Sequence, residues 1–306
     1  MRQNKLSAIL LGACLLLAPR VCQSATFRVA TYNLESYLDQ ATETRRPKTP
    51  ESRAKNQESI LALKPDVLAL QEMGSPSALK ELQTSLKAAG LDLPFSAHVT
   101  GFDTNIFVAV LSRFPILQNH SHTNADFLLN GRRHRVSRGF AELDLQVSSN
   151  LVVTLFSAHL KSKRAVAIAD EAELRIEEAK LLREKIDTRL ATDPAANIVV
   201  VGDFNDTKDS PSTRAIIGRG KTKLVDTRPA ERNGDNQPNP NPAWEPKSIT
   251  WTHYFGKEDS YSRIDYILAS PALARRWVTN ETCVLTLPNW AVGSDHRPIL
   301  ATFQAD

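Results

Sequence analysis

The chain contains few cysteine, glycine and proline residues for its length. Its 306 residues include 3 Cys, 12 Gly and 17 Pro. These counts exclude a disulfide-rich scaffold, a collagen-like chain and a low-complexity polymer. No segment repeats at a fixed period, so repeat architectures are excluded as well. With 42% hydrophobic and 24% charged residues, the composition is that of an ordinary globular protein.

Only one stretch of the sequence is apolar enough to meet a membrane, and it lies at the N-terminus. A positively charged start precedes an apolar run over residues 6–18, and small residues follow at Ser24 and Ala25. This order is typical of a secretory signal peptide, and the run is short for a span of ~20 residues. We therefore expect residues 1–25 to be a signal peptide and residues 26–306 to form a secreted or periplasmic domain. A membrane anchor and a lipoprotein are the alternatives.

Loss of residues 1–25 changes both the net charge and the number of cysteines. The full chain carries 38 Lys+Arg against 34 Asp+Glu, which gives a net charge of +4. Residues 1–25 contain three basic residues and no acid, so the mature chain would carry +1. The overall charge therefore argues neither for nor against a nucleic-acid partner. Cys14 and Cys22 would be lost, and with Cys283 as the single remaining cysteine the fold cannot depend on an internal disulfide.

Strand-like and helical segments follow one another along the chain and predict one mixed α/β domain. Helices are expected at residues 54–63, 77–89 and 165–190. Strands are expected at residues 26–33, 66–72, 106–116, 138–145, 151–159, 197–205, 249–255, 264–269 and 298–303. Prolines at 47 and 50 are expected to prevent regular structure in the polar stretch 35–53. No interior linker separates two cores, so one domain is the economical interpretation.

Four of the apolar runs end in a polar cluster. The clusters contain Asn33, Glu72, His159, Asp203 and Asn205. A strand buried on both faces can expose polar side chains only where it leaves the sheet, and ligand sites lie at strand ends in α/β proteins. If these ends share one edge of the sheets, the five side chains converge there. A single polar strand end is usually only a turn, but four together predict a site.

The residue types in these clusters favour a hard metal ion. The candidate oxygen ligands are Asn33, Glu72, Asp203, Asn205, Asp265 and Asp295. Mg²⁺ prefers oxygen ligands and often uses one or two carboxylates, so the set predicts Mg²⁺ or Mn²⁺. No cysteine pair, HExxH motif or clustered histidine spacing indicates a zinc site. Each acid taken alone could be a solvated turn residue.

Two histidines accompany these acids. His296 directly follows Asp295, and His159 ends an apolar run. Asp265 could orient a histidine by accepting a hydrogen bond from its ring. The remaining histidines are expected on the surface or in loops: His98, His120, His122, His134 and His253. The sequence has no GxSxG, Walker or GxGxxG motif, so serine-hydrolase chemistry and these two nucleotide-binding motifs are not indicated.

Eight short motifs occur in an order that resembles the endonuclease/exonuclease/phosphatase superfamily. They are TYNLES, LQEM, SRFPI, SRGF, SAHLKS, GDFND, RIDYIL and SDHRPI, and they span residues 31–299. The superfamily includes deoxyribonuclease I, abasic-site endonucleases, neutral sphingomyelinases and inositol polyphosphate 5-phosphatases. GDFND or SDHRP alone would be weak support, whereas eight blocks in order are specific.

The resemblance implies a fold and a metal site. The fold would be a four-layer α/β/β/α sandwich, in which two mixed β-sheets pack face to face with helices outside. The site would lie where the two sheets open at one edge. Glu72 matches the main metal-binding glutamate of the superfamily, assisted by Asn33 and Asp295.

The same resemblance implies catalytic roles. Asp203 matches the aspartate that orients or deprotonates the attacking water, and Asn205 matches an amide that positions water and phosphate. His159 matches a histidine of the deoxyribonuclease and sphingomyelinase branches. Asp265 and His296 match the aspartate–histidine pair of the superfamily.

Basic residues near these motifs suggest contacts to a phosphate-ester substrate. Arg138, in SRGF, falls where some members place a phosphate-contacting arginine. Two basic clusters could track a polyanionic backbone: Arg132, Arg133, Arg135 and Arg138, and Lys161, Lys163 and Arg164. Solvated loops would explain both clusters equally well.

The function expected from the sequence is an exported Mg²⁺-dependent phosphoesterase, with nucleic acid as the expected substrate. The alternatives are a sphingomyelinase-like lipid phosphodiesterase and a small-molecule phosphatase. A binding domain that has lost catalysis is the alternative of another class, although every superfamily position is filled. We expect a monomer without stable insertion into a membrane.

Overall fold

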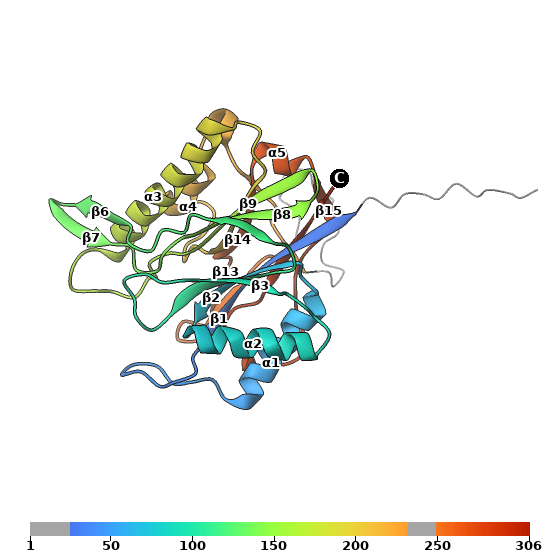
Figure 1. Ribbon diagram of the computed structural model, residues 1–306. Coiled ribbons are helices and arrows are strands. Elements are labelled where there is room, and N and C mark those ends of the chain that lie inside the picture. Colours follow the sequence, from blue (N-terminus) through green and yellow to red (C-terminus); the bar gives the residue numbers. More distant parts are fainter. Residues whose placement is uncertain (1–24, 232–248) are drawn as a thin grey trace, which may run out of the picture.

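The computed structural model describes residues 25–231 and 249–306, and these form four stacked layers (Figure 1). Two six-stranded sheets face each other, and helices cover the outer face of each sheet. The expected α/β/β/α sandwich is therefore confirmed. Residues 1–24, nearly all of the expected signal peptide, lie outside the described residues. Among the helices of the described part, none is long and apolar enough to span a membrane.

The first sheet has the strand order β15-β16-β1-β2-β4-β3. Its strands are β1 (Thr26–Tyr37), β2 (Val67–Met73), β3 (Phe95–Val99), β4 (Phe107–Ser112), β15 (Trp277–Val284) and β16 (Ile299–Gln304). β1 pairs in parallel with β2 and antiparallel with β16, so the sheet is mixed and joins the two ends of the described chain.

The second sheet has the order β11-β14-β10-β9-β8-β5. Its strands are β5 (Ile116–Asn119), β8 (Ala141–Ser148), β9 (Leu151–His159), β10 (Ile198–Asp203), β11 (Val225–Asp226) and β14 (Asp265–Ala269). β9 and β10 are parallel, and the register pairs Asp203 with His159 on one side and with Asp265 on the other. Three of the expected site residues thus lie side by side at one strand end.

Helices and two small hairpins complete the fold. The helices are α1 (Pro50–Leu63), α2 (Pro76–Ala88), α3 (Glu171–Thr192), α4 (Pro211–Ile217) and α5 (Pro271–Ala274). The hairpins are β6 (Asp126–Leu129) with β7 (Arg132–Arg135), and β12 (His253–Phe255) with β13 (Ser260–Ser262). Apolar side chains of α1 and α2 pack on the first sheet, and those of α3 and α4 pack on the second. The core therefore has three apolar layers, one between the sheets and one under each pair of helices.

The central strands send alternate side chains into the core between the sheets. In β1, Phe27 and Val29 lie in that core, whereas Ala30 and Tyr32 pack in the layer with α1 and α2. The inner core also contains odd-numbered residues of four other strands: Val67, Ala69, Val153, Leu155, Val199, Val201, Ile267 and Ala269. Successive side chains of a strand point to opposite faces, so the next odd-numbered positions of these strands face inwards as well.

The element boundaries differ from the sequence-based expectation at informative places. α1 begins at Pro50, where Thr49 caps it by accepting a hydrogen bond from Ser52 N over 3.2 Å. Proline is tolerated at the first helical position because its missing N–H would have no partner there, so excluding regular structure up to residue 53 was wrong. The longest helix begins at residue 171 rather than 165, because Asp170 accepts hydrogen bonds as its N-cap. Strands β3 and β15 and the β6–β7 hairpin were not expected.

Gly202 is the backbone position at which this fold depends most directly on a glycine. Its φ is +131°, and a Cβ atom there would lie 2.0 Å from the carbonyl oxygen of Ala158 on the neighbouring strand. We expect Gly202→Ala to lower the free energy of unfolding by roughly 3 kcal/mol, because backbone strain and a backbone clash would act together. Urea unfolding measures this change. Gly220→Ala is the control: φ is +64° but no atom lies within 4 Å of the added Cβ, so about 1 kcal/mol is expected. Equal losses in the two variants would contradict the role of the close approach.

Candidate active site

The candidate active site lies where the inner face of the two sheets changes from apolar to polar. The inward-facing positions at this end are Thr31, Asn33, Gln71, Ser157, His159, Asp203 and Asp265, and all are buried. Buried polar groups need hydrogen-bond partners, and these side chains provide them for one another. Asn33 Nδ2 donates to Asp203 Oδ2 over 3.0 Å, and Gln71 Nε2 donates to Ser157 Oγ over 3.4 Å. Each bond crosses from the first sheet to the second, so the strand ends converge as expected.

Asp203 lies at the centre of this polar layer. Besides Asn33, the backbone N–H of Asn205 donates to its Oδ1 over 2.8 Å. The Nε2 atoms of His159 and His296 lie 3.5 and 3.7 Å from its Oδ2. Burial raises the pKa of Asp203 to about 6, although the positive charge of His296 acts in the opposite direction. A carboxylate with this raised proton affinity is suited to accept a proton from water near neutral pH.

His296 and Asp265 form a buried pair behind Asp203. His296 Nδ1 lies 2.9 Å from Asp265 Oδ2, which leaves Nε2 on the side of Asp203. Burial alone would lower the pKa of His296, but the carboxylates of Asp265 and Asp203 raise it to about 10. The imidazolium form can donate a hydrogen bond from Nε2. Ser294 holds the turn in place, because its Oγ donates to the carbonyl of Asn33 and accepts from the N–H of His296.

His159 and Asn205 complete the surroundings of Asp203. Burial and the positive charge of Arg138 hold the pKa of His159 well below its usual range, so the ring is neutral. Its Nδ1 has no hydrogen-bond partner among the described residues. Asn205 has a positive φ of 54°, and its side-chain amide donates to Leu160 O over 3.0 Å. Positive φ in a non-glycine residue is uncommon and is concentrated at functional sites.

Glu72 lines the site because the backbone of β2 is irregular at this residue. Its position is even-numbered, so regular alternation would turn it towards α1 and α2. A positive φ of 57° at Glu72 and an irregularity in the β1–β2 pairing after Asn33 change that direction. Glu72 Oε2 accepts hydrogen bonds from Ser36 N over 3.0 Å, Ser36 Oγ over 3.1 Å and Arg45 Nη1 over 3.0 Å. The strained backbone therefore places this carboxylate beside Ser36, near the end of β1, and beside Arg45 of the loop that follows β1.

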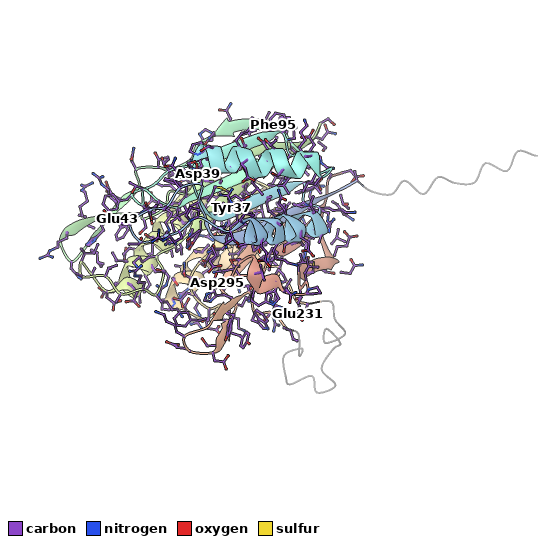
Figure 2. The ribbon with its side chains drawn as sticks, turned by 90° about the horizontal axis from the view of Figure 1, so that it is seen from below. Tyr37, Asp39, Glu43, Phe95, Glu231 and Asp295 are labelled. Carbon is purple, nitrogen blue, oxygen red and sulfur yellow. The ribbon has the colours of Figure 1, made fainter. Side chains whose placement is uncertain are left out.

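One cavity of about 590 Å³ contains most of the expected site. Seven expected residues line it: Asn33, Glu72, His159, Asp203, Asn205, Asp295 and His296. Asp265 does not line the cavity, because it lies behind His296 with 1% of its surface exposed. Asp265 can therefore act only through His296. Figure 2 shows that Asp295 lies in the orange to red, C-terminal part of the ribbon.

The residues of this cavity fit a divalent cation. Glu72 and Asp295 line it together with Glu35, and Asn33 adds a side-chain carbonyl oxygen. Burial and the negative charges of Asp295 and Glu72 raise the pKa of Glu35. Lys48 and Arg45 pair with Glu35 and Glu72, whereas Asp295 lies among histidines. Oxygen ligands of this kind suit Mg²⁺ or Mn²⁺.

The structure corrects the expectation for Arg138. Its side chain does not line the cavity and is 6% exposed; Nη2 donates to the carbonyl of Leu160 over 2.7 Å. The positive charge of Arg138 acts on the buried carboxyl of Glu178 and opposes the rise in its pKa that burial causes. A buried arginine bound to a backbone carbonyl supports the loop that holds Asn205, and it cannot contact a substrate phosphate as placed.

The two expected basic clusters are largely engaged in internal contacts. Arg133 Nη1 binds both carboxylate oxygens of Asp126 over 2.8 and 2.9 Å. Lys161 Nζ donates to the carbonyls of Ser162 and Arg164 over 2.9 and 2.7 Å. Of the seven residues of the two clusters, Arg164 lines the cavity.

Other basic residues of the cavity come from the loop between β1 and α1. From the sequence, this loop was expected only to lack regular structure. Arg45, Arg46 and Lys48 line the cavity from this loop. The loop, marked by Glu43, extends from the same end of the sandwich as the β6–β7 hairpin (Figures 1 and 2). The three basic residues within four positions were a visible signal in the sequence, but only the fold shows that they turn towards the strand ends.

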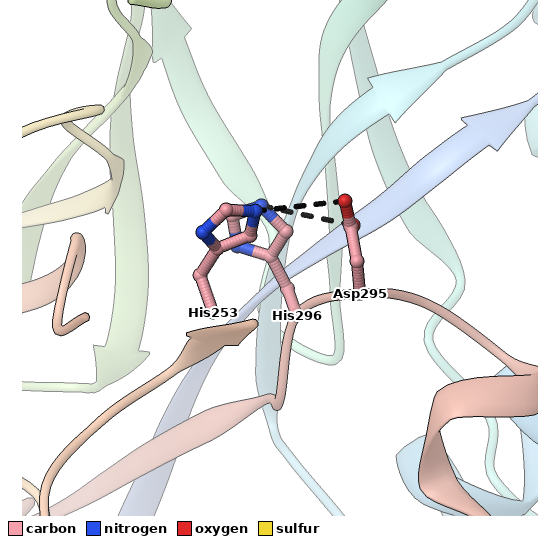
Figure 3. A group of neighbouring side chains, drawn as sticks. All are labelled: His253, Asp295 and His296. Carbon is pink, nitrogen blue, oxygen red and sulfur yellow. Dashed lines mark ion pairs between the residues drawn. The ribbon is translucent and has the colours of Figure 1, made fainter. Parts of the chain in front are cut away.

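His253 was expected to be a surface or loop residue, but it is the half-buried first residue of β12. His253 lines the cavity, and its backbone pairs with that of His296 in an isolated antiparallel β-bridge. Its ring centroid lies 4.5 Å from that of His296, and its Nε2 lies 3.6 Å from Asp295 Oδ2 (Figure 3). No spacing in the sequence links His253 with residues more than forty positions later, so the contact could be found only in the structure.

Comparison with known proteins places the chain in a family. A model of the endonuclease/exonuclease/phosphatase family matches residues 30–296. The chain belongs to this family. No curated protein sequence matches the chain. Members of the family hydrolyse phosphoester bonds and generally use a divalent metal ion.

Solved structures with the same fold are distant in sequence. Truncated TDP2 from Caenorhabditis elegans is 17% identical, with a TM-score of 0.60 over 92% of this chain and 98% of that chain. A beta toxin from Staphylococcus aureus is 17% identical, with a TM-score of 0.62 over 90% of this chain and 99% of that chain. Sphingomyelinase C from Streptomyces griseocarneus is 18% identical, with a TM-score of 0.59 over 92% and 100% of the two chains. These likenesses show the sandwich fold.

The buried pair of His296 and Asp265 generates a test of catalysis against structure. We expect His296→Ala to lower kcat for phosphoester hydrolysis by roughly 10²–10⁴-fold, because the cavity would lose the imidazolium hydrogen-bond donor beside Asp203. Asp265→Asn should lower kcat through the same histidine. The double variant should be far less impaired than the product of the two single effects, because the residues act as a unit.

The readouts are kcat and Tm for the four proteins of this cycle. His122→Ala is the matched control, because His122 is a half-buried histidine bound to Glu142 over 2.6 Å and does not line the cavity. A lowered Tm with unchanged kcat in both single variants would reduce the pair to a structural contact.

Proposed function

We propose that the protein is an exported, Mg²⁺- or Mn²⁺-dependent phosphodiesterase that cleaves phosphodiester bonds in nucleic acid. The observation that carries this proposal is the shared cavity, in which a buried carboxylate and two histidines adjoin an acidic group suited to a cation. Phosphodiester hydrolysis needs an attacking water, neutralisation of the non-bridging oxygens and stabilisation of the leaving group. The cavity offers side chains for each of these tasks.

Asp203 is the proposed base. Its carboxylate is fixed by Asn33 and by the N–H of Asn205, so it can hold a water and accept its proton. His296 would donate from Nε2 to a phosphoryl oxygen, and Asp265 keeps that ring in place. The amide of Asn205 and the neutral ring of His159 would hydrogen-bond the phosphate or the water. A bound divalent cation, held by Asn33, Glu72 and Asp295, would supply positive charge to the phosphate oxygens.

The basic side of the cavity supports a polyanionic substrate. Arg46 and Arg164 line it, together with Arg45 and Lys48, which pair with Glu72 and Glu35 of the acidic group. Each neighbouring phosphate of a nucleic-acid strand can be neutralised by one such residue, whereas a single phosphate ester needs fewer. This distribution of charge favours nucleic acid over a small phosphate ester.

A lipid phosphodiesterase is the second candidate, because a neighbouring surface is apolar. A second cavity of about 510 Å³ is lined by Phe102, Val166, Ile168 and Arg135, among others. Phe102 and Ile168 are 62% and 64% exposed, and the guanidinium of Arg135 lies 5.5 Å from the centre of the Phe102 ring. Exposed apolar groups beside arginines suit the interface of a membrane.

Metal dependence and substrate class can be tested in one assay. Duplex DNA, single-stranded RNA, sphingomyelin vesicles and a phosphate monoester are incubated with the purified chain, with Mg²⁺ or with EDTA. We expect cleavage of nucleic acid that is abolished by EDTA and restored by Mg²⁺ or Mn²⁺. Cleavage of sphingomyelin alone would favour the lipid candidate, and full activity in EDTA would contradict metal dependence.

Two variants separate the metal site from general damage. Glu72→Gln keeps the size of the side chain but removes its charge, so it should weaken metal binding and activity while Tm stays near that of the wild type. Glu177→Gln on α3 is the matched control, because Glu177 pairs with Lys180 on the surface. Activity should be unchanged in the control.

Export is proposed from the N-terminal sequence alone. A positively charged start, the apolar run over residues 6–18 and the small residues that follow support it. We expect the protein purified from its native host to begin near Ala25 or Thr26, as measured by intact mass. A mature protein that keeps Met1, or that carries a diacylglycerol on Cys14, would contradict the proposal.

A further inference from the structure

His253 and Asp295 stand out in the cavity because they come from separate elements and meet without a direct hydrogen bond. His253 is the first residue of β12, and Asp295 lies in the turn before β16. The N–H of Tyr254 donates to the carbonyl of Asp295 over 3.0 Å, so the two segments are fastened by the backbone next to both side chains. Figure 3 shows the imidazole of His253 and that of His296 both facing the Asp295 carboxylate.

The distances between these groups differ from those of the other histidine–carboxylate pairs. The Nε2 atom of His253 lies 3.6 Å from Asp295 Oδ2, and that of His296 lies 3.9 Å from Asp295 Oδ1. Hydrogen-bonded pairs of this chain are much shorter: 2.9 Å for His296 with Asp265 and 2.6 Å for His122 with Glu142. The Asp295 contacts are too long for hydrogen bonds.

A separation of this size is close to that of two ligands on one metal ion. Two donor atoms that are each about 2.1 Å from a divalent cation lie roughly 3.0–3.4 Å apart. The 3.6 Å between His253 Nε2 and Asp295 Oδ2 therefore needs a closure of only a few tenths of an ångström. The two side chains are partly exposed, at 16% and 42%, so a cation can reach them from the cavity.

His253 is better placed than His296 to be this nitrogen ligand. The Nδ1 atom of His296 is bonded to Asp265, and its Nε2 lies between the carboxylates of Asp203 and Asp295. This ring is surrounded by negative charge and serves as a donor in the proposed reaction. The Nε2 atom of His253 lies 3.6 Å from Asp295 Oδ2, and in its neutral form this imidazole can present the Nε2 lone pair to a cation bound at Asp295.

We infer that His253 is a ligand of the divalent cation at Asp295 and gives this site a preference for a transition metal ion. Mg²⁺ binds almost entirely through oxygen and dehydrates reluctantly, whereas an imidazole nitrogen raises the affinity for first-row transition ions. An oxygen-rich cavity with one imidazole therefore binds Mn²⁺ ahead of Mg²⁺. The inference rests on the metal dependence proposed above, but it concerns binding and not the substrate.

The test measures binding of Mn²⁺ to the purified, metal-free chain in the absence of substrate. Electron paramagnetic resonance of bound Mn²⁺ should show a coupling to an imidazole nitrogen in the wild type. His253→Gln should lose this coupling and bind Mn²⁺ about tenfold or more weakly, with Mg²⁺ affinity within about twofold of the wild type. Titration calorimetry gives both affinities.

His120→Gln is the matched control, because His120 is an exposed histidine that lies 3.8 Å from Asp144 and does not line the cavity. It should retain both the nitrogen coupling and the preference for Mn²⁺. Absence of nitrogen coupling in the wild type, or its persistence in His253→Gln, would overturn the inference. A wild-type spectrum without the coupling overturns the inference even if a variant does not fold. If the chain cleaves no nucleic acid but shows the coupling, the proposed substrate fails and the metal ligand stands.

Discussion

The whole site depends on one constraint: the two sheets pack face to face, so the inward side chains of both sheets meet in one layer. Along β1 and β10, alternate side chains fill the space between the sheets, and these positions are apolar until the strands near their ends. There the same alternation turns Asn33 and Asp203 inwards from opposite sheets, 3.0 Å apart. A slip of one residue in either strand would turn its polar residue towards the outer helices. The packing of the apolar layer therefore fixes the position of the polar groups in the candidate active site.

Burial gives these groups their chemistry. A charged side chain removed from water is costly unless other groups compensate for the loss of hydration. Asp203, Asp265 and His296 compensate one another, and the result is a carboxylate with raised proton affinity beside an imidazole that keeps its proton. Positive φ angles at Glu72 and Asn205 show that the backbone is also strained at this edge. The stable sandwich tolerates a polar, strained edge because its three apolar layers stabilise the rest.

Loops and a short hairpin around this edge add further basic and histidine side chains to the cavity. The central carboxylate, amide and histidines come from strand ends, whereas Arg45 and Lys48 come from the loop after β1 and His253 from a short hairpin. The chain shares the sandwich with solved structures that are 17–18% identical in sequence, and these include proteins as different as TDP2 and a sphingomyelinase. A common scaffold with variable loops accounts for such diversity, because loops can change without disturbing the core.

The sequence by itself determined most of the central strands and the polar residues at their ends, and its resemblance to a known family implied the sandwich. Apolar runs that stop at Asn33, His159 and Asp203 are local patterns, and local patterns are readable without a fold. Tertiary structure alone decided that Arg138 is buried and that His253 joins the cavity. The physical reason is distance along the chain: which loop residue meets a strand end depends on how separate segments pack, and no pattern within either segment encodes it.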